Sequence, residues 1–274
     1  MNTPVVGILM TVYKNDNVMA VKEAIVSIVN QSYSSSQLFL GVDGPISAEL
    51  KDLLLVLDEQ FKTINLVFFE SNRGLASSLN DLITLILKDK TIKYIARMDS
   101  DDIAYFNRIE KQVLFFESNP KVDVCGTSCR EFGAPFALEA KHLPKEHDEL
   151  VDFSVVRCPF IHPTVMFKAS IFETGIRYPT DTSLTEDMAL WFVLLERGFK
   201  FHNINEVLLD YRLNEHTVAR RHGIGKAFSE FSIRFRYMVR LKRVTFKNIL
   251  LVGCRLLFHI LPVSIMTYAY KKAR

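Results

Sequence analysis

The segment Ile95-Ala96-Arg97-Met98-Asp99-Ser100-Asp101-Asp102 places three carboxylates within four residues, directly after an apolar run. In an Asp-x-Asp pattern both side chains can face a cleft where a strand stops. Carboxylates side by side repel each other unless a cation lies between them. Hard divalent cations such as Mg²⁺ or Mn²⁺ prefer oxygen ligands and are often shared with substrate phosphates. An acidic loop or a helix N-cap would accommodate the same residues, so this segment alone leaves both interpretations open.

Apolar runs and apolar helical spacing alternate through the first hundred residues. Strands are predicted at 5–12, 38–42, 65–69 and 92–98, and helices at 18–29, 48–61 and 75–87, with Asn17 as a candidate cap of the first helix. This alternation predicts an α/β protein with a parallel sheet and helices on both faces.

Polar residues follow each of the predicted strands: Tyr13, Asp43, Asn72-Arg73-Gly74 and Asp99 to Asp102. In such sheets ligands bind beyond the carboxyl ends of the strands. The shared position favours a ligand site more strongly than any one motif does.

The second half is less regular. Helices are predicted at 107–118, 144–153 and 184–197, the last ending at Gly198, and strands or extended segments at 122–129, 164–167, 201–204 and 207–211. Residues 132–143 and 158–163 are predicted as irregular chain.

Composition limits the class of protein. The chain has 274 residues, of which 49% are hydrophobic and 24% charged, which suits one large domain or one domain with an appendage. The four cysteines (Cys125, Cys129, Cys158 and Cys254) form no zinc pattern and are expected to be reduced thiols of a cytosolic protein. The first residues, Met1-Asn2-Thr3-Pro4-Val5, contain no signal-peptide pattern.

Charge is distributed unevenly. From Phe231 onward there are ten Lys or Arg and no Asp or Glu, so the rest of the chain carries 24 basic and 31 acidic residues. Residues 231–247 alternate apolar and basic side chains, which suits in-plane contact with an anionic membrane, although packing against the rest of the chain is an alternative. Arg255, His259 and Pro262 interrupt the apolar stretch 249–270 and argue against a membrane span. No nucleic-acid-binding motif accompanies the charge, and nucleic acid is not an expected partner.

Six segments carry a family resemblance: ILMTVY (8–13), SIVNQSY (27–33), VDG (42–44), NRGLA (72–76), MDSDD (98–102) and TEDMALW (185–191). In this order they resemble family-two glycosyltransferases with the GT-A fold, in the branch that makes bacterial surface polysaccharides such as O-antigen or capsule. The departures are mild. The family often has two acidic residues where this chain has Val42-Asp43, and Pro-x-Tyr where this chain has Thr11-Val12-Tyr13.

The resemblance implies a GT-A type fold, with a Rossmann-like, mixed but mostly parallel sheet flanked by helices. It implies a catalytic domain at 1–215 and a C-terminal helical, basic and apolar tail at 216–274. The implied activity is inverting, metal-dependent transfer of a hexose from a UDP-sugar, with UDP-glucose or UDP-galactose favoured, to a hydroxyl of a lipid-diphosphate-linked or growing saccharide. The implied cofactor is Mn²⁺ or Mg²⁺, and the implied location is peripheral, on the cytoplasmic face of the bacterial inner membrane.

The resemblance also assigns donor-binding roles residue by residue. The backbone of Thr11, Val12 and Tyr13 lines the base and ribose pocket, and Asp43 accepts a hydrogen bond from the uracil or ribose, although Asp43 also suits an ordinary turn. Asn72 and Arg73 lie near the nucleotide or sugar, with a solvated helix start as the alternative for Arg73. Asp99 and Ser100 approach the nucleotide, Asp101 with Asp99 binds the metal, and Asp102 either caps a helix or contacts the sugar.

The same correspondence makes Asp187 the base that takes the acceptor's proton and Glu186 its helper, although acidic residues are common in any first helical turn. Possible acceptor or diphosphate contacts are His162, Trp191 and His216, and Arg212 is a possible contact of the diphosphate.

The sequence leaves room for few other functions. A dinucleotide-dependent oxidoreductase needs Gly-x-Gly-x-x-Gly after the first strand, and residues 10–16 contain no glycine. The remaining alternatives are transfer of an N-acetylhexosamine or rhamnose, and a catalytically inactive sugar-nucleotide-binding protein.

Overall fold

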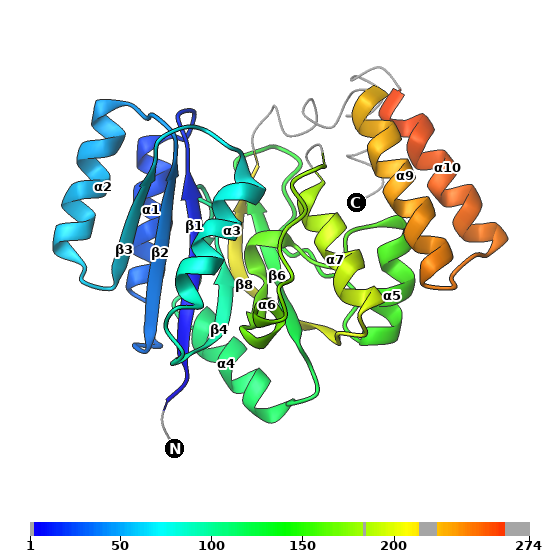
Figure 1. Ribbon diagram of the computed structural model, residues 1–274, viewed down its shortest axis with the longest axis horizontal. Helices are drawn as coiled ribbons and strands as arrows, with labels where there is room; N and C mark the ends of the chain where they lie inside the picture. Colours follow the sequence, from blue (N-terminus) through cyan, green and yellow to red (C-terminus); the bar gives the residue numbers. More distant parts are fainter. Residues whose placement is uncertain (1–2, 183–184, 214–223, 261–274) are drawn as a thin grey trace.

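The computed structural model describes residues 3–182, 185–213 and 224–260 and contains one eight-stranded mixed sheet (Figure 1). Its strand order is β3-β2-β1-β4-β7-β6-β8-β5. The strands are β1 (Val5–Val12), β2 (Ser36–Asp43), β3 (Ile64–Phe69), β4 (Ile92–Arg97), β5 (Ile103–Ala104), β6 (Val124–Phe132), β7 (Met166–Lys168) and β8 (Phe201–Arg212).

Helices cover both faces of the sheet, as the alternation of elements predicts. One core lies under α1 (Val18–Val29), α2 (Ala48–Gln60) and α4 (Arg108–Ser118). The other lies under α3 (Leu75–Ile86), α5 (His147–Val156), α6 (Ser170–Glu173) and α7 (Glu186–Glu196). Alternate residues of β1 serve the two cores, Ile8 and Met10 on one side and Leu9 on the other, which explains why this strand is apolar throughout. Asn17 caps α1 by accepting a hydrogen bond from the Ala20 amide, as predicted.

The first four strands run parallel and end at one edge of the sheet. Val12 pairs with Val42, and Asp43 pairs with Phe69, so β1, β2 and β3 end together. β4 pairs with β1 up to Leu9, and the Met98 amide then donates to the Leu9 carbonyl at 3.0 Å. The acidic turn that follows Met98 therefore lies at the same edge as the ends of β1, β2 and β3.

The second half of the sheet departs from a purely parallel pattern. β7 is antiparallel to both β4 and β6, whereas β6 and β8 are parallel. The two extended segments predicted at 201–204 and 207–211 are one strand, β8, whose register against β6 shifts between Ile204 and Val207. The two-residue β5 was not predicted, and its pairing of Ile103 with Asp210 joins the acidic turn to the end of β8.

The described part of the tail forms two helices, α9 (Ile224–Arg240) and α10 (Phe246–Ile260), that pack on each other and on the catalytic part (Figure 1). Val155 of α5, Met238 of α9 and Val252 of α10 form a small third core. One face of the hairpin therefore packs against the rest of the chain, which is the alternative that the sequence left open. Among the described residues no helix is both long and apolar enough to cross a membrane. The four cysteines are free thiols, as expected.

Candidate active site

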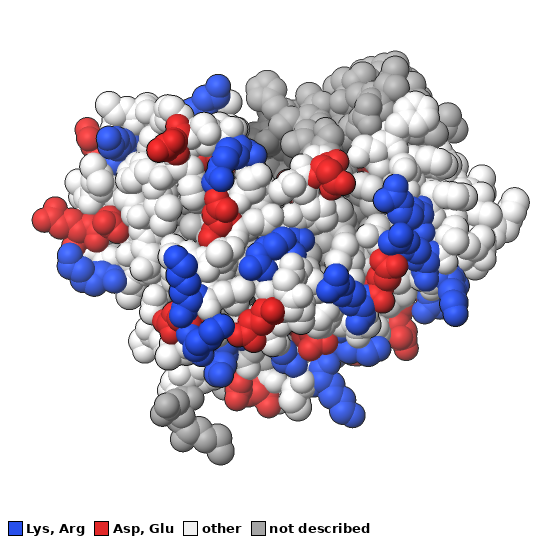
Figure 2. Space-filling model, viewed as in Figure 1, with Lys and Arg blue, Asp and Glu red and all other residues white. Residues whose placement is uncertain are grey.

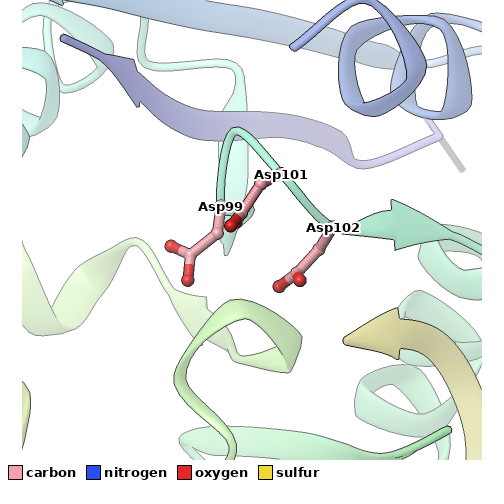
Figure 3. A group of neighbouring side chains, drawn as sticks. All are labelled: Asp99, Asp101 and Asp102. Atoms are coloured by element: carbon pink, nitrogen blue, oxygen red, sulfur yellow. The ribbon is translucent and has the colours of Figure 1, made fainter. Parts of the chain in front are cut away.

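Three carboxylates converge in the turn between β4 and β5 (Figure 3). Asp99, Asp101 and Asp102 each offer an oxygen, and these oxygens lie within 4.8 Å of one another. The turn forms because β4 stops at Arg97 while β5 restarts at Ile103 to pair with β8. The sheet thus holds three acidic side chains together at the edge where β1, β2 and β3 end.

A fourth carboxylate, Asp16, joins the cluster from the loop after β1. One of its oxygens accepts hydrogen bonds from the Ser100 hydroxyl at 2.9 Å and from the Tyr13 amide at 3.1 Å. Burial, with a smaller contribution from Asp99, raises the pKa of Asp16 to about 6. Asp16 was not predicted as a site residue, because Lys14-Asn15-Asp16 has the composition of an ordinary polar turn.

The crowding of charge is also visible in the other pKa values. Burial raises the pKa of Asp101 to about 6, with further contributions from Asp99 and Asp16. Burial followed by the charges of Asp99 and Asp101 raises the pKa of Asp102 well above its usual range. A site that opposes ionisation of its own carboxylates in this way is suited to bind a cation.

Arg212, at the end of β8, fastens this turn. Its amide donates to a carboxylate oxygen of Asp102 at 2.8 Å, and its guanidinium donates to the Asp101 carbonyl at 2.7 Å and to Glu23 of α1 at 2.6 Å. Asp102, which is fully buried, therefore holds the strand end rather than capping α4. Arg212 lies at the acidic cluster, and its contact with a diphosphate stays a prediction.

Arg97 lies beneath the cluster and is 2% exposed. It forms an ion pair with Asp99, and its Nε has no hydrogen-bond partner among the described residues. Beside it, Nε2 of His162 lies 3.0 Å from the Tyr178 hydroxyl. Burial and the nearby charge of Arg97 lower the pKa of His162 to about 3, so this ring is neutral at physiological pH. Arg97 and Tyr178 were not recognised as site residues, because a strand arginine and a loop tyrosine carry no motif.

Asp43 organises the loop that precedes α3. Its two carboxylate oxygens accept from the Arg73 and Gly74 amides at 2.9 Å each, while the Asn72 side chain donates to its carbonyl at 3.1 Å. Gly44 has φ +84°, and a Cβ there would lie 2.5 Å from the Asn72 amide nitrogen, which explains the Asp-Gly pair. The structure thus brings Asp43, Asn72 and Arg73 together as predicted. Arg73 itself forms an exposed ion pair with Asp81.

The end of β1 offers backbone and one aromatic ring to the same edge. Val12 is fully buried, Thr11 is half-buried and Tyr13 is exposed. A contact of Val12 with a ligand would therefore run through its main chain, in agreement with the backbone role predicted for this segment.

Asp187 and Glu186 occupy the first turn of α7 and are both half-buried. Burial and the neighbouring charge of Glu186 raise the pKa of Asp187 to about 6, and Asp99 contributes in the same direction. Asp187 is therefore within electrostatic reach of the acidic turn, although 88 positions separate it from Asp99 in the chain. A carboxylate whose pKa lies near neutrality suits a general base.

Two further candidates are placed differently. Trp191 is 1% exposed and packs among Phe160, Phe167 and Phe201, so it is a core residue and the structure gives it no surface for a direct contact with an acceptor. The TEDMALW segment combines site and core residues because α7 turns one face toward the sheet. His216 lies outside the described residues.

The described residues fit a divalent cation at the acidic turn. The second oxygen of Asp102 is buried without a hydrogen-bond partner among the described residues, and three carboxylates converge. Oxygen ligands of this kind are those that Mg²⁺ and Mn²⁺ prefer.

Comparison with known proteins agrees with this geometry. The family model described as glycosyl transferase family 2 matches residues 8–174. The chain belongs to glycosyl transferase family 2. It is 31% identical to the UDP-Gal:alpha-D-GlcNAc-diphosphoundecaprenol beta-1,3-galactosyltransferase of Escherichia coli, over 99% of this chain and 97% of the relative. It is 28% identical to the amylovoran biosynthesis glycosyltransferase AmsE of Erwinia amylovora, over 98% of each.

Proteins of similar fold whose structures have been solved are more distant in sequence from this family 2 glycosyltransferase. The mannosyltransferase PcManGT of Pyrobaculum calidifontis, in complex with GDP-Man and Mn²⁺, aligns with a TM-score of 0.65 at 16% identity, over 93% of this chain and 70% of that one. TarS of S. aureus in complex with UDP-GlcNAc aligns with a TM-score of 0.64 at 12% identity, over 93% and 72%. These similarities confirm the predicted GT-A type fold.

Proposed function

We propose that this family 2 glycosyltransferase is an inverting hexosyltransferase of bacterial surface-polysaccharide synthesis. It moves a hexose from a UDP-sugar, with UDP-galactose or UDP-glucose favoured, to a hydroxyl of a lipid-diphosphate-linked or growing saccharide and forms a β-glycosidic bond. The observation that carries the proposal is the pairing of an acidic turn with a separate, half-buried carboxylate, Asp187, whose pKa is raised to about 6. The E. coli relative, similar along its whole length, supports the choice of donor and acceptor.

The residues divide the reaction between them. Asp99 and Asp101, with Asp102 behind them, would hold a Mn²⁺ or Mg²⁺ ion through their carboxylate oxygens. Once bound, this ion would offset the charge of the diphosphate leaving group. Arg212 fixes the turn and places a cation beside the cluster, and Ser100 is held by Asp16. Asp43 holds the Asn72-Arg73-Gly74 loop in place to border the nucleotide.

Asp187 takes the acceptor's proton, and Glu186 raises its basicity. As the hydroxyl proton moves to a carboxylate oxygen of Asp187, the acceptor oxygen forms its bond to the anomeric carbon. The bond from that carbon to the diphosphate oxygen breaks on the opposite face, and the nucleoside diphosphate leaves with the bonding electrons. A single displacement of this kind inverts an α-linked donor into a β-linked product.

A donor screen tests the proposal. The purified protein with Mn²⁺ is supplied with UDP-glucose, UDP-galactose, their N-acetyl forms or an activated rhamnose, together with a synthetic lipid-diphosphate GlcNAc or GalNAc acceptor. We expect a new β-linked hexose by NMR. Transfer of only an N-acetylhexosamine or rhamnose would replace the donor assignment. Nucleotide-sugar binding without transfer to either acceptor would favour the inactive binding protein.

We further propose that the hairpin of α9 and α10 rests on an anionic membrane, at the cytoplasmic face of the inner membrane. One stripe of α9 is buried (Ala227, Glu230, Arg234 and Met238), while the opposite side exposes an apolar stripe. That exposed side forms an open hollow of about 640 Å³ lined by Phe228, Phe231, Ser232, Phe235, Arg236, Val239 and Arg240. Basic side chains beside exposed aromatic ones suit anionic lipid headgroups. Figure 2 displays Lys and Arg gathered near the hairpin, beside uncharged surface.

Replacing two exposed apolar residues of α10 should release the protein from vesicles. Phe246, which is 83% exposed, and Ile249 lie on one side of the helix, and Glu at both positions (Phe246→Glu with Ile249→Glu) adds charge where contact with lipid is proposed. We expect about tenfold weaker cosedimentation with phosphatidylglycerol vesicles. Leu114→Glu on the distant helix α4, also at an exposed position, is the matched control and should sediment like the unaltered protein. Unchanged sedimentation of the double variant would reject the membrane surface.

A further inference from the structure

A buried ion cluster joins the α9–α10 hairpin to the catalytic part of the chain. Arg234, which is 1% exposed, donates through Nε to Glu230 at 2.7 Å. Arg255 of α10 donates to the same carboxylate oxygen at 2.8 Å. Arg234 and Glu230 are buried, whereas the side chain of Arg255 is 34% exposed. Burying a charged group such as the Arg234 guanidinium costs free energy unless other groups compensate for it.

Part of that compensation comes from the end of α5. Nη1 of Arg234 donates to the carbonyls of Ser154 and Val155 at 3.0 and 3.1 Å, and both residues lie in the last turn of α5. A cation is favourable at a helix C-terminus because the terminal carbonyls lack partners within the helix. The chain leaves α5 at this point and continues through Cys158 to His162, which lies beside Arg97 and Tyr178. Arg234 thus anchors the beginning of a segment that lines the site.

Helix α9 also packs against α7. Tyr237 of α9 stacks on Phe192 of α7 with ring centroids 4.8 Å apart, and Arg240 forms an ion pair with Glu196 at 3.1 Å. The second pair lies about one turn closer to the C-terminus than the first on both helices, so α7 and α9 run in the same direction (Figure 1). Arg234 lies about one turn before Tyr237. Arg234 therefore lies at about the level of the first turn of α7, while its guanidinium is directed toward the end of α5.

We propose that Arg234 is a positioning residue for the transfer reaction, which holds the first turn of α7 and the end of α5 in place and keeps a positive charge behind the Asp187 carboxylate. This inference rests on the proposed role of Asp187 as the base. The hairpin is then a working part of the active site as well as a membrane-facing surface.

The electrostatics of Asp187 agree with this geometry. Burial and Glu186 raise its pKa, and the charge of Arg234 lowers it. Within residues 3–182, 185–213 and 224–260, the titratable or charged groups that face Asp187 are Glu186 on its own helix, Asp99 after β4, Cys158 after α5, Tyr178 after α6 and Arg234 on α9. Among these described groups Arg234 is the cation, so its loss removes positive charge from the surroundings of the carboxylate.

Two substitutions at one position separate charge from contact. In Arg234→Gln the charge is removed while a side-chain amide donor is kept, and in Arg234→Lys the charge is kept while simultaneous donation to two carbonyls and Glu230 is lost. In Arg234→Gln we expect the acid limb of the pH profile of kcat/KM to move up by about half a unit or more, because the base protonates more easily. In Arg234→Lys we expect the acid limb to stay in place and kcat to fall about fivefold, with the KM for donor unchanged.

Arg240→Gln is the matched control, because it removes a cation of the same helix that pairs with Glu196 at the far end of α7. It should leave the acid limb in place. An unmoved acid limb in a folded Arg234→Gln protein would overturn the inference. If Arg234→Gln does not fold, Arg234→Lys decides, since a kcat equal to that of the unaltered protein would also overturn it.

The failure of this inference can be distinguished from failure of the proposed function. Asp187→Asn that retains full turnover removes the base assignment itself. Asp187→Asn that is inactive, together with an Arg234→Gln profile identical to that of the unaltered protein, removes only the positioning role.

Discussion

Asp187→Asn is expected to lower turnover by about 10²- to 10⁴-fold, the scale on which a general base contributes. Asparagine keeps the size and polarity of the side chain but cannot accept the acceptor's proton. Because the donor diphosphate is proposed to bind at the acidic turn rather than at Asp187, the Kd of the donor should change by less than about twofold. Steady-state transfer assays, together with calorimetric titration of the UDP-sugar, measure the two quantities.

The pH dependence of the unaltered protein gives a second test of the same assignment. Burial and Glu186 raise the pKa of Asp187 to about 6. Because a base acts only when it is deprotonated, kcat/KM should be constant above this pH and fall below it, about tenfold for each further pH unit. Because the pKa of Asp187 is raised, kcat/KM should begin to fall at a pH closer to neutrality than it would with an aspartate of ordinary pKa.

Glu196→Gln provides the control for Asp187→Asn, because it neutralises an exposed acidic residue in the last turn of the same helix. Its turnover should match that of the unaltered protein. If Asp187→Asn keeps more than about a tenth of the turnover, the proton is taken by another group.

The sequence identified the strands of the first half and the residues that follow them, for a physical reason. Buried parallel strands need continuous apolar runs, and these runs end where the chain meets solvent. Val5–Val12 and its neighbours therefore predicted the ligand-binding edge, and with it the convergence of Asp43 with the Arg73 loop and of Asp99 with Asp101.

Residues that depend on contacts between distant segments could not be predicted. Asp16 enters the acidic cluster only because β1 and β4 are neighbours, and Arg97 lies beneath it only because β4 is central in the sheet. Arg234 was counted among the basic residues of the tail, although the packing of α9 buries it. Trp191 belongs to the motif segment of α7 but to the core in space, because successive residues of a helix point in different directions.

Asp101→Ala is expected to lower transfer at least about a hundredfold, which is the scale associated with a metal-holding residue. The Asp101 carboxylate is one of three that converge, and its pKa is raised to about 6 chiefly by burial and then by Asp99 and Asp16. Removing it leaves the turn anchored, because Arg212 donates to the carbonyl of Asp101 and to the carboxylate of Asp102 rather than to the Asp101 side chain. The fold should therefore survive, and the loss should appear in the binding of the ion.

Binding of Mn²⁺ provides a readout that does not depend on turnover. Electron paramagnetic resonance counts free Mn²⁺, and in the presence of UDP the Asp101→Ala protein should need at least about tenfold more Mn²⁺ for half-saturation. Asp52→Ala, at an exposed position of α2, is the matched control and should bind Mn²⁺ like the unaltered protein. Equal Mn²⁺ affinity and equal turnover in Asp101→Ala would place the ion elsewhere. If Asp101→Ala binds Mn²⁺ more weakly but keeps full turnover, the ion at the acidic turn is not needed for transfer. Catalysis would then depend on Asp187.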